Sequence, residues 1–99
     1  MYHHTVLLQF GPGFDGAAQA AFEALARDVI GAVQGVLAYR LTANEAPSRG
    51  PYRHVLFSAF VDRAAFDGYD RSELHGRIKA VLAPYLVSLV VGDGEVPHG

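Results

Sequence analysis

The sequence contains no cysteine, no tryptophan and a single lysine among its 99 residues. Without cysteine the chain can form no disulfide bond, thiolate nucleophile or zinc–thiolate site. Charged residues make up 18% of the chain, and the net charge is −2. The basic residues form no cluster of the kind that nucleic-acid binding requires. We therefore expect neither thiol chemistry nor a nucleic-acid partner.

The chain also has no long hydrophobic run. Its first residues have no basic stretch followed by a cleavage site, so they do not resemble a signal peptide. The apolar runs are far too short to span a bilayer. We expect a cytoplasmic protein with no membrane contact and a single domain over residues 1–99. The apolar share is 51%, and on so small a body it favours a face that is buried against a partner.

The expected elements follow the order β-α-β-β-α-β. Apolar residues at spacings of three and four predict a long helix after Asp15 and another from Ser72 to Tyr85, with a short helix after Asp62. We expect an α+β, ferredoxin-like fold, in which helices cover one face of a four-stranded antiparallel sheet and strands one and three lie in its centre. The expected strands are residues 3–10, 36–44, 52–61 and 86–91, followed by a polar tail over 92–99.

The third expected strand is apolar on both of its sides. Val55, Phe57 and Ala59 point to one side, whereas Leu56 and Phe60 point to the other. Only one of these sides can meet the helices. Twofold symmetry is the commonest way to cover the other. The sequence therefore predicts a homodimer whose sheets pack face to face.

Four segments resemble the stress-responsive A/B barrel domain family, whose members are dimeric α+β barrels. They are HTVLLQF at 4–10, YRHV at 52–55, YDRSELH at 69–75 and LVVGD at 89–93. The resemblance covers nearly the whole chain, although Ser72 and Glu73 stand where the family usually carries His-Pro.

One branch of that family consists of plant polyketide cyclases of the olivetolic acid cyclase type. The resemblance implies that the catalytic tyrosine and histidine of this branch fall on Tyr69 and His75. It implies that the pocket histidines fall on His4 and His54. These four positions are therefore the first candidates for a site.

Tyr69 and His75 suit acid–base chemistry without a cofactor. An imidazole titrates near neutrality, so His75 can accept a proton. A phenol can donate a hydrogen bond to a carbonyl oxygen as negative charge develops on it. Together they suit proton abstraction beside a carbonyl, as in an aldol cyclisation. The structural alternative is that Tyr69 covers the core and His75 bonds its own loop.

His4 and His54 share the side of their strands with apolar residues, which include Val6 and Leu8. On adjacent strands they are expected to be neighbours on one face and to line a substrate pocket. Phe22 is expected to be a core residue that also forms a pocket wall. We expect no metal, because no carboxylate stands at ligand spacing in the sequence.

The predicted function is a small homodimeric A/B barrel protein with an apolar pocket and no cofactor. Its chemistry would be cyclase- or lyase-type acid–base catalysis on a small carbonyl compound. Two alternatives stay open: a non-enzymatic dimeric protein that is stress-associated or binds a small ligand, and a cofactor-independent monooxygenase. A cavity that touches both Tyr69 and His75 would favour an enzyme. Side chains that fill that space would argue against a pocket.

Overall fold

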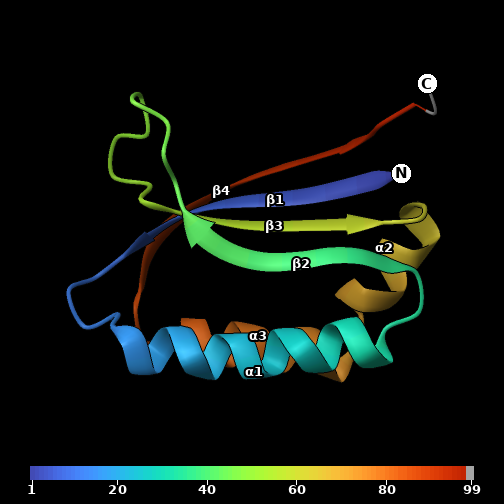
Figure 1. The fold of residues 1–99 in the computed structure, drawn as a ribbon, viewed down its shortest axis with the longest axis horizontal. Helices are drawn as coiled ribbons and strands as arrows, with labels where there is room; N and C mark the ends of the chain where they lie inside the picture. The colour runs from blue at the N-terminus through green and yellow to red at the C-terminus, as the bar shows by residue number, and fades with distance from the viewer. Residues whose placement is uncertain (98–99) are drawn as a thin grey trace.

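A computed structural model describes residues 1–97 of the chain. A four-stranded sheet lies over a layer of helices, and the N-terminus lies at the sheet (Figure 1). None of the helices in the described part is long and apolar enough to cross a membrane. The elements are β1 (Tyr2–Phe10), α1 (Gly16–Ala32), β2 (Val36–Ala43), β3 (His54–Phe60), α2 (Arg63–Asp70), α3 (Glu73–Leu82) and β4 (Leu86–Glu95).

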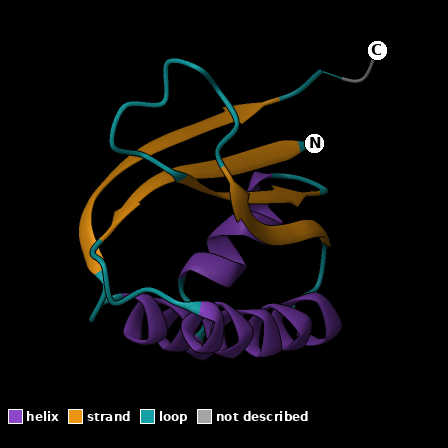
Figure 2. Ribbon diagram, turned by 60° about the vertical axis from the view of Figure 1, so that its left-hand side comes forward, coloured by secondary structure: helices purple, strands orange, loops and turns teal. Residues whose placement is uncertain are grey.

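The sheet has the strand order β2-β3-β1-β4, with every neighbouring pair antiparallel. The first and third strands therefore lie in the centre, as predicted. All three helices lie on one side of the sheet (Figure 2). The ferredoxin-like α+β fold predicted from the element order is confirmed.

The fourth strand is longer than the sequence predicted. β4 continues past Val91 to Glu95, because β1 begins at Tyr2 and offers backbone partners to the added residues. The sequence did not predict this extension, because it contains Gly92 and Gly94 and glycine is disfavoured in strands. Residues 92–95 of the expected tail are therefore strand, and its residues 98 and 99 lie outside the described residues.

Two other boundaries differ from the expectation by more than one residue. β3 begins at His54, because residues 49–53 form turns closed by hydrogen bonds to the carbonyls of Arg49 and Pro51. α3 ends at Leu82, where the amide of Tyr85 bonds back to the Leu82 carbonyl in a turn. Neither shift changes the order of the elements.

Each helix begins at a side-chain cap that the sequence predicted. The carboxylates of Asp15 and Asp62 accept hydrogen bonds from backbone amides three residues later, at 3.0 Å and 2.8 Å. The Ser72 hydroxyl accepts from the His75 amide at 3.2 Å. Such caps satisfy amides that the helix itself cannot. The Ser72 cap also fixes the backbone of His75 relative to the end of α2.

The two faces of the sheet differ in what covers them. The inner face meets the helices and is buried at Val6, Leu8 and Leu56. On the outer face Leu7 pairs with Val55 on one side and with Val90 on the other. Val90 is 46% exposed within the single chain. The outer face is therefore apolar without a covering layer from its own chain.

Candidate functional site

A cavity of about 410 Å³ lies between the inner face of the sheet and α3. Ligand sites in proteins have volumes of roughly 300–1,000 Å³, so a small organic molecule fits. Val6, Leu8 and Leu56 form its floor, and Leu89 and Val91 of β4 form one wall. The residues that contribute polar groups to its lining are His4, Tyr39, Tyr69, His75 and Lys79.

The hydroxyl groups of Tyr39 and Tyr69 form a hydrogen bond beside this cavity. Either phenol can donate to the other, and the one that accepts keeps its own proton free. Burial raises the pKa of Tyr39 to about 12 and also raises the pKa of Tyr69. Both phenols are therefore protonated at neutral pH, so the pair can present one O–H donor to the cavity.

His75 is held by the chain segment that joins α2 to α3. Its Nδ1 lies 2.9 Å from the carbonyl oxygen of Asp70. A carbonyl only accepts, so Nδ1 carries the hydrogen and, in the neutral ring, Nε2 is left with a free lone pair. The His75 ring lies 4.9 Å from the Tyr69 ring, centroid to centroid. A proton acceptor and a phenol donor therefore stand side by side at one cavity wall.

His4 forms a pair with Asp93, its cross-strand partner on β4. The His4 Nδ1 lies 2.6 Å from a carboxylate oxygen of Asp93. The His4 ring also packs on Phe66 at 4.8 Å. A carboxylate on Nδ1 orients an imidazole. This is a second oriented imidazole on the cavity, with its Nε2 free.

Two predicted site residues do not line this cavity. The expectation that His4 and His54 are neighbours is wrong: β3 pairs His4 with Ser58, whereas His54 pairs with Leu8. The His54 ring instead packs between Phe10 and Phe14, with centroids at 5.0 Å and 5.2 Å.

Phe22, the other residue, is fully buried and is not part of the cavity lining. Its ring stacks on Tyr39 at 5.9 Å. Phe22 therefore supports a tyrosine that does line the cavity, but it reaches the cavity only through that contact.

The sequence analysis did not single out Tyr39 and Lys79, which line the cavity, or Asp93, which bonds the cavity residue His4. Tyr39 shares the inner side of β2 with Leu41, and this alternation was a usable signal. Asp93 could not be found, because its pairing with His4 depends on the extension of β4. Within residues 1–97, no three His, Cys, Asp or Glu side chains cluster closely enough to hold a metal ion.

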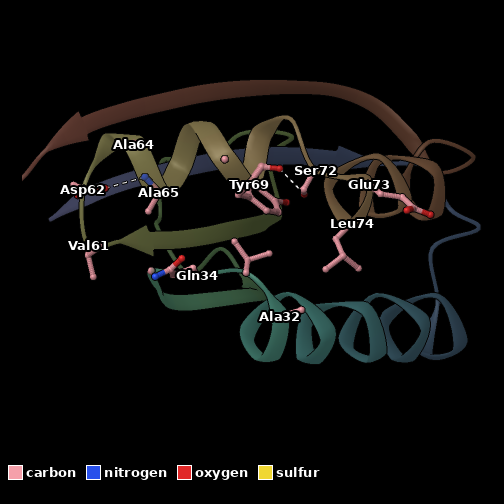
Figure 3. A pocket seen from close by; sticks show the side chains of 13 residues that line it. Ala32, Gln34, Val61, Asp62, Ala64, Ala65, Tyr69, Ser72, Glu73 and Leu74 are labelled. Atoms are coloured by element: carbon pink, nitrogen blue, oxygen red, sulfur yellow. Dashed lines mark hydrogen bonds between the residues drawn. The ribbon is translucent and has the colours of Figure 1, made fainter.

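A second hollow of about 710 Å³ lies outside the core, between the end of α1 and α2 (Figure 3). Small side chains such as Ala32, Ala64 and Ala65 line much of it. The hydroxyl group of Ser72 at its rim already has a hydrogen-bond partner, since Ser72 Oγ donates to the Tyr69 carbonyl at 2.6 Å. Tyr69 lines both spaces, but the imidazole of His75 lines only the inner one. The inner cavity is the candidate site.

A model of the stress-responsive A/B barrel domain matches residues 2–96. The chain belongs to this family. A search of curated proteins found no match. The predicted resemblance is confirmed, and the predicted fold agrees with it.

Solved structures similar to this A/B barrel domain share its fold. A dimeric ferredoxin-like protein of unknown function from Jannaschia sp. CCS1 is 21% identical with a TM-score of 0.83, and the match covers 96% of this chain and 98% of that one. A family protein from Mesorhizobium loti is 21% identical, with a TM-score of 0.75 and coverage of 99% and 97%. An antibiotic biosynthesis monooxygenase is 17% identical, with a TM-score of 0.76 and coverage of 99% and 100%.

Proposed function

We propose that this A/B barrel domain protein catalyses proton abstraction beside a carbonyl group, without a cofactor. The single observation that carries the proposal is the cavity that touches both Tyr69 and His75. Its walls are otherwise mainly apolar, which lowers the local dielectric and strengthens hydrogen bonds to developing charge. The reaction class is cyclase- or lyase-type chemistry on a small carbonyl compound.

In the proposed step, the free Nε2 of His75 takes a proton from the carbon beside a carbonyl. The electron pair of that C–H bond forms an enolate, whose oxygen accepts a hydrogen bond from the Tyr69–Tyr39 pair. The enolate carbon then attacks a second carbonyl of the same molecule and forms a C–C bond. The imidazolium of His75 returns its proton to the new alkoxide. Atoms and charge balance, so the net reaction is an intramolecular aldol addition.

His4 has a supporting role in this proposal. The Asp93 carboxylate holds the imidazole through Nδ1. When the ring is protonated, Nε2 of His4 can donate a hydrogen bond to the second carbonyl. Such a donor would stabilise the alkoxide that forms at that oxygen. Val6 and Leu8 would contact the apolar part of the substrate.

We further propose that the active form is a homodimer whose sheets pack through their outer faces. Leu7, Val55, Phe57 and Val90 supply an apolar surface on that face. Related structures with this fold are described as dimeric. A charge in its centre, as in Phe57→Arg, should convert the dimer to a monomer in sedimentation. A wild-type protein that is monomeric at micromolar concentration would contradict this part of the proposal.

Deuterium incorporation tests the chemistry without knowledge of the natural substrate. A medium-chain methyl ketone is incubated with the protein in D₂O, and NMR follows the protons beside the carbonyl. Wild type should accelerate the exchange, whereas His75→Gln and Tyr69→Phe should reduce it about 100-fold. Arg77→Gln is the matched control, because Arg77 is exposed on the same helix and does not line the cavity. Exchange by wild type at the buffer rate would refute the proposal.

A cofactor-independent monooxygenase is the second candidate, because a structure of this fold is described as an antibiotic biosynthesis monooxygenase. An oxygen electrode distinguishes the two reactions. Oxygen uptake that depends on a carbonyl compound and on His75 would favour the monooxygenase. Exchange or cyclisation without oxygen uptake would favour the first proposal.

A further inference from the structure

Lys79 is the only lysine of the chain, and it lines the same cavity as Tyr69 and His75. We propose that the ligand of this cavity is an organic acid whose carboxylate pairs with the Lys79 ammonium, while its carbonyl reaches the Tyr69–Tyr39 pair. The inference rests on the proposed function and narrows its substrate class from carbonyl compounds to keto acids.

The position of Lys79 places its charge at the mouth of the cavity. His75 and Lys79 are four residues apart on α3, so their side chains lie on one face of the helix. The opposite wall is β4, where Leu89 and Val91 point inward yet are 45% and 49% exposed. The cavity therefore opens between α3 and β4, and Lys79 stands on the α3 side of that opening.

The Lys79 ammonium is available for a ligand. No carboxylate lies within ion-pair distance of it among residues 1–97, where the ion pairs are those of His4, Arg63 and His75. No arginine lines the cavity. Among residues 1–97, Lys79 is therefore the only lysine or arginine that lines the cavity.

The charges of the cavity are separated along its length. His4 and Asp93 lie at the end near α2, since the His4 ring contacts Phe66. Leu82 and Leu86 line the other end, where α3 leads into β4. Lys79 follows His75 in the direction of that second end. A ligand carboxylate at Lys79 would thus avoid repulsion from Asp93 and leave the carbonyl near Tyr69.

The helix also sets the size of the ligand. Four residues along an α-helix advance about 6 Å, and a lysine side chain reaches about as far again. A carbonyl at Tyr69 and a carboxylate at Lys79 should therefore be separated by a short aliphatic chain. A linear oxo-octanoate meets this requirement when its ketone is next to the terminal methyl group, at the opposite end from the carboxylate. The matching oxo-octanamide has the same shape without the charge.

Calorimetric titration with these two probes at low salt tests the inference. Wild type should bind the acid about fivefold more tightly than the amide, as one partly exposed ion pair allows. Lys79→Met should bind both probes with equal affinity, whereas Lys79→Arg should keep the preference for the acid. Arg77→Met is the control for a general loss of positive charge on α3 and should behave as wild type.

The outcomes separate this inference from the function on which it rests. If wild type binds both probes equally, or if Lys79→Met keeps the preference, Lys79 does not select an acid. Deuterium exchange into the bound amide would then still support the proposed function. If neither probe binds to wild type, both proposals are overturned. A Lys79→Met protein that melts earlier but keeps the preference would show that Lys79 only stabilises the end of α3.

Discussion

Tyr39 and Tyr69 are thirty residues apart in the sequence, yet their hydroxyl groups share a hydrogen bond in the buried interior. Tyr39 comes from β2, and Tyr69 comes from the last turn of α2. Phe22 stacks on Tyr39 from α1, so three elements fix the position of one phenol pair. The proposed hydrogen-bond donor to the enolate oxygen is thus formed by residues of the hydrophobic core.

A double-mutant cycle on this pair should show strong coupling. Tyr39→Phe and Tyr69→Phe should each lower the free energy of unfolding by about 1–2 kcal/mol, since each leaves one buried hydroxyl without its partner. The double variant should lose less than the sum, with a coupling of about 1 kcal/mol. Urea denaturation of the four proteins measures it. Strictly additive losses would mean that the two hydroxyls do not interact in solution.

The same pair predicts an alkaline limit of stability. Burial raises the pKa of Tyr39 to about 12, whereas an unfolded tyrosine has a pKa of about 10. Above about pH 10 the unfolded chain releases protons that the folded chain retains, so the free energy of unfolding should fall with rising pH until the folded pKa is passed. Absorbance of phenolate at alkaline pH, followed beside circular dichroism, checks this.

The matched control for the alkaline limit is the variant with both Tyr39→Phe and Tyr69→Phe. It should show a shallower loss of stability above about pH 10. If Tyr39 and Tyr69 of the folded protein ionised near pH 10, before any unfolding, this prediction would be wrong.

The element order and the inner side of each strand could be predicted from the sequence, because both follow from local patterns. Alternation placed Val6 and Leu8 on the inner face, and the cap at Ser72 placed His75 at the start of α3. Alternation says which side a residue faces but not how far along the sheet it lies. That is why His54 was assigned to the wrong end of the sheet.

The polar partners of the site could not be predicted for the same reason. The contact of Tyr39 with Tyr69 depends on how α2 packs against the sheet, and His4 meets Asp93 only through the register of β1 with β4. A carboxylate eighty-nine residues away in the sequence carries no local signal. The sequence shows which residues are tyrosines, histidines and carboxylates, but only the folded structure shows which of them form pairs.

His54 should make the protein sensitive to mild acid. Burial lowers the pKa of its imidazole, and its Nδ1 has no hydrogen-bond partner within the described residues. As pH falls below about 6.5, the unfolded chain binds a proton that the folded His54 refuses. The free energy of unfolding should therefore fall until pH passes the folded pKa. Denaturation at a series of pH values measures this slope.

His54→Leu should flatten that slope at little cost at neutral pH, since the lost nitrogen made no hydrogen bond. His3→Gln is the control, because His3 lies on the outer face of β1. An unchanged slope in His54→Leu would assign the acid sensitivity to another group.

Gly35 should tolerate no side chain. Its φ is 85°, in the left-handed region, and an added Cβ would lie 2.7 Å from the Ala65 Cβ and 3.0 Å from Val61 Cγ2. Gly35→Ala should lower the free energy of unfolding by about 2–4 kcal/mol through backbone strain and overpacking. Gly68→Ala is the control. It lies in α2 with no atom near the added Cβ, and it should stabilise the protein by up to about 1 kcal/mol. Equal thermal melting of the two variants would contradict this account.

The most direct test of the central claim is the rate of deuterium incorporation for Tyr69→Phe, His75→Gln and the double variant in one experiment. If His75 removes the proton while Tyr69 stabilises the enolate, the groups act as a unit. Each single variant should then be nearly as slow as the double variant. Wild-type rates in either single variant, or losses that multiply independently in the double variant, would contradict the proposed site.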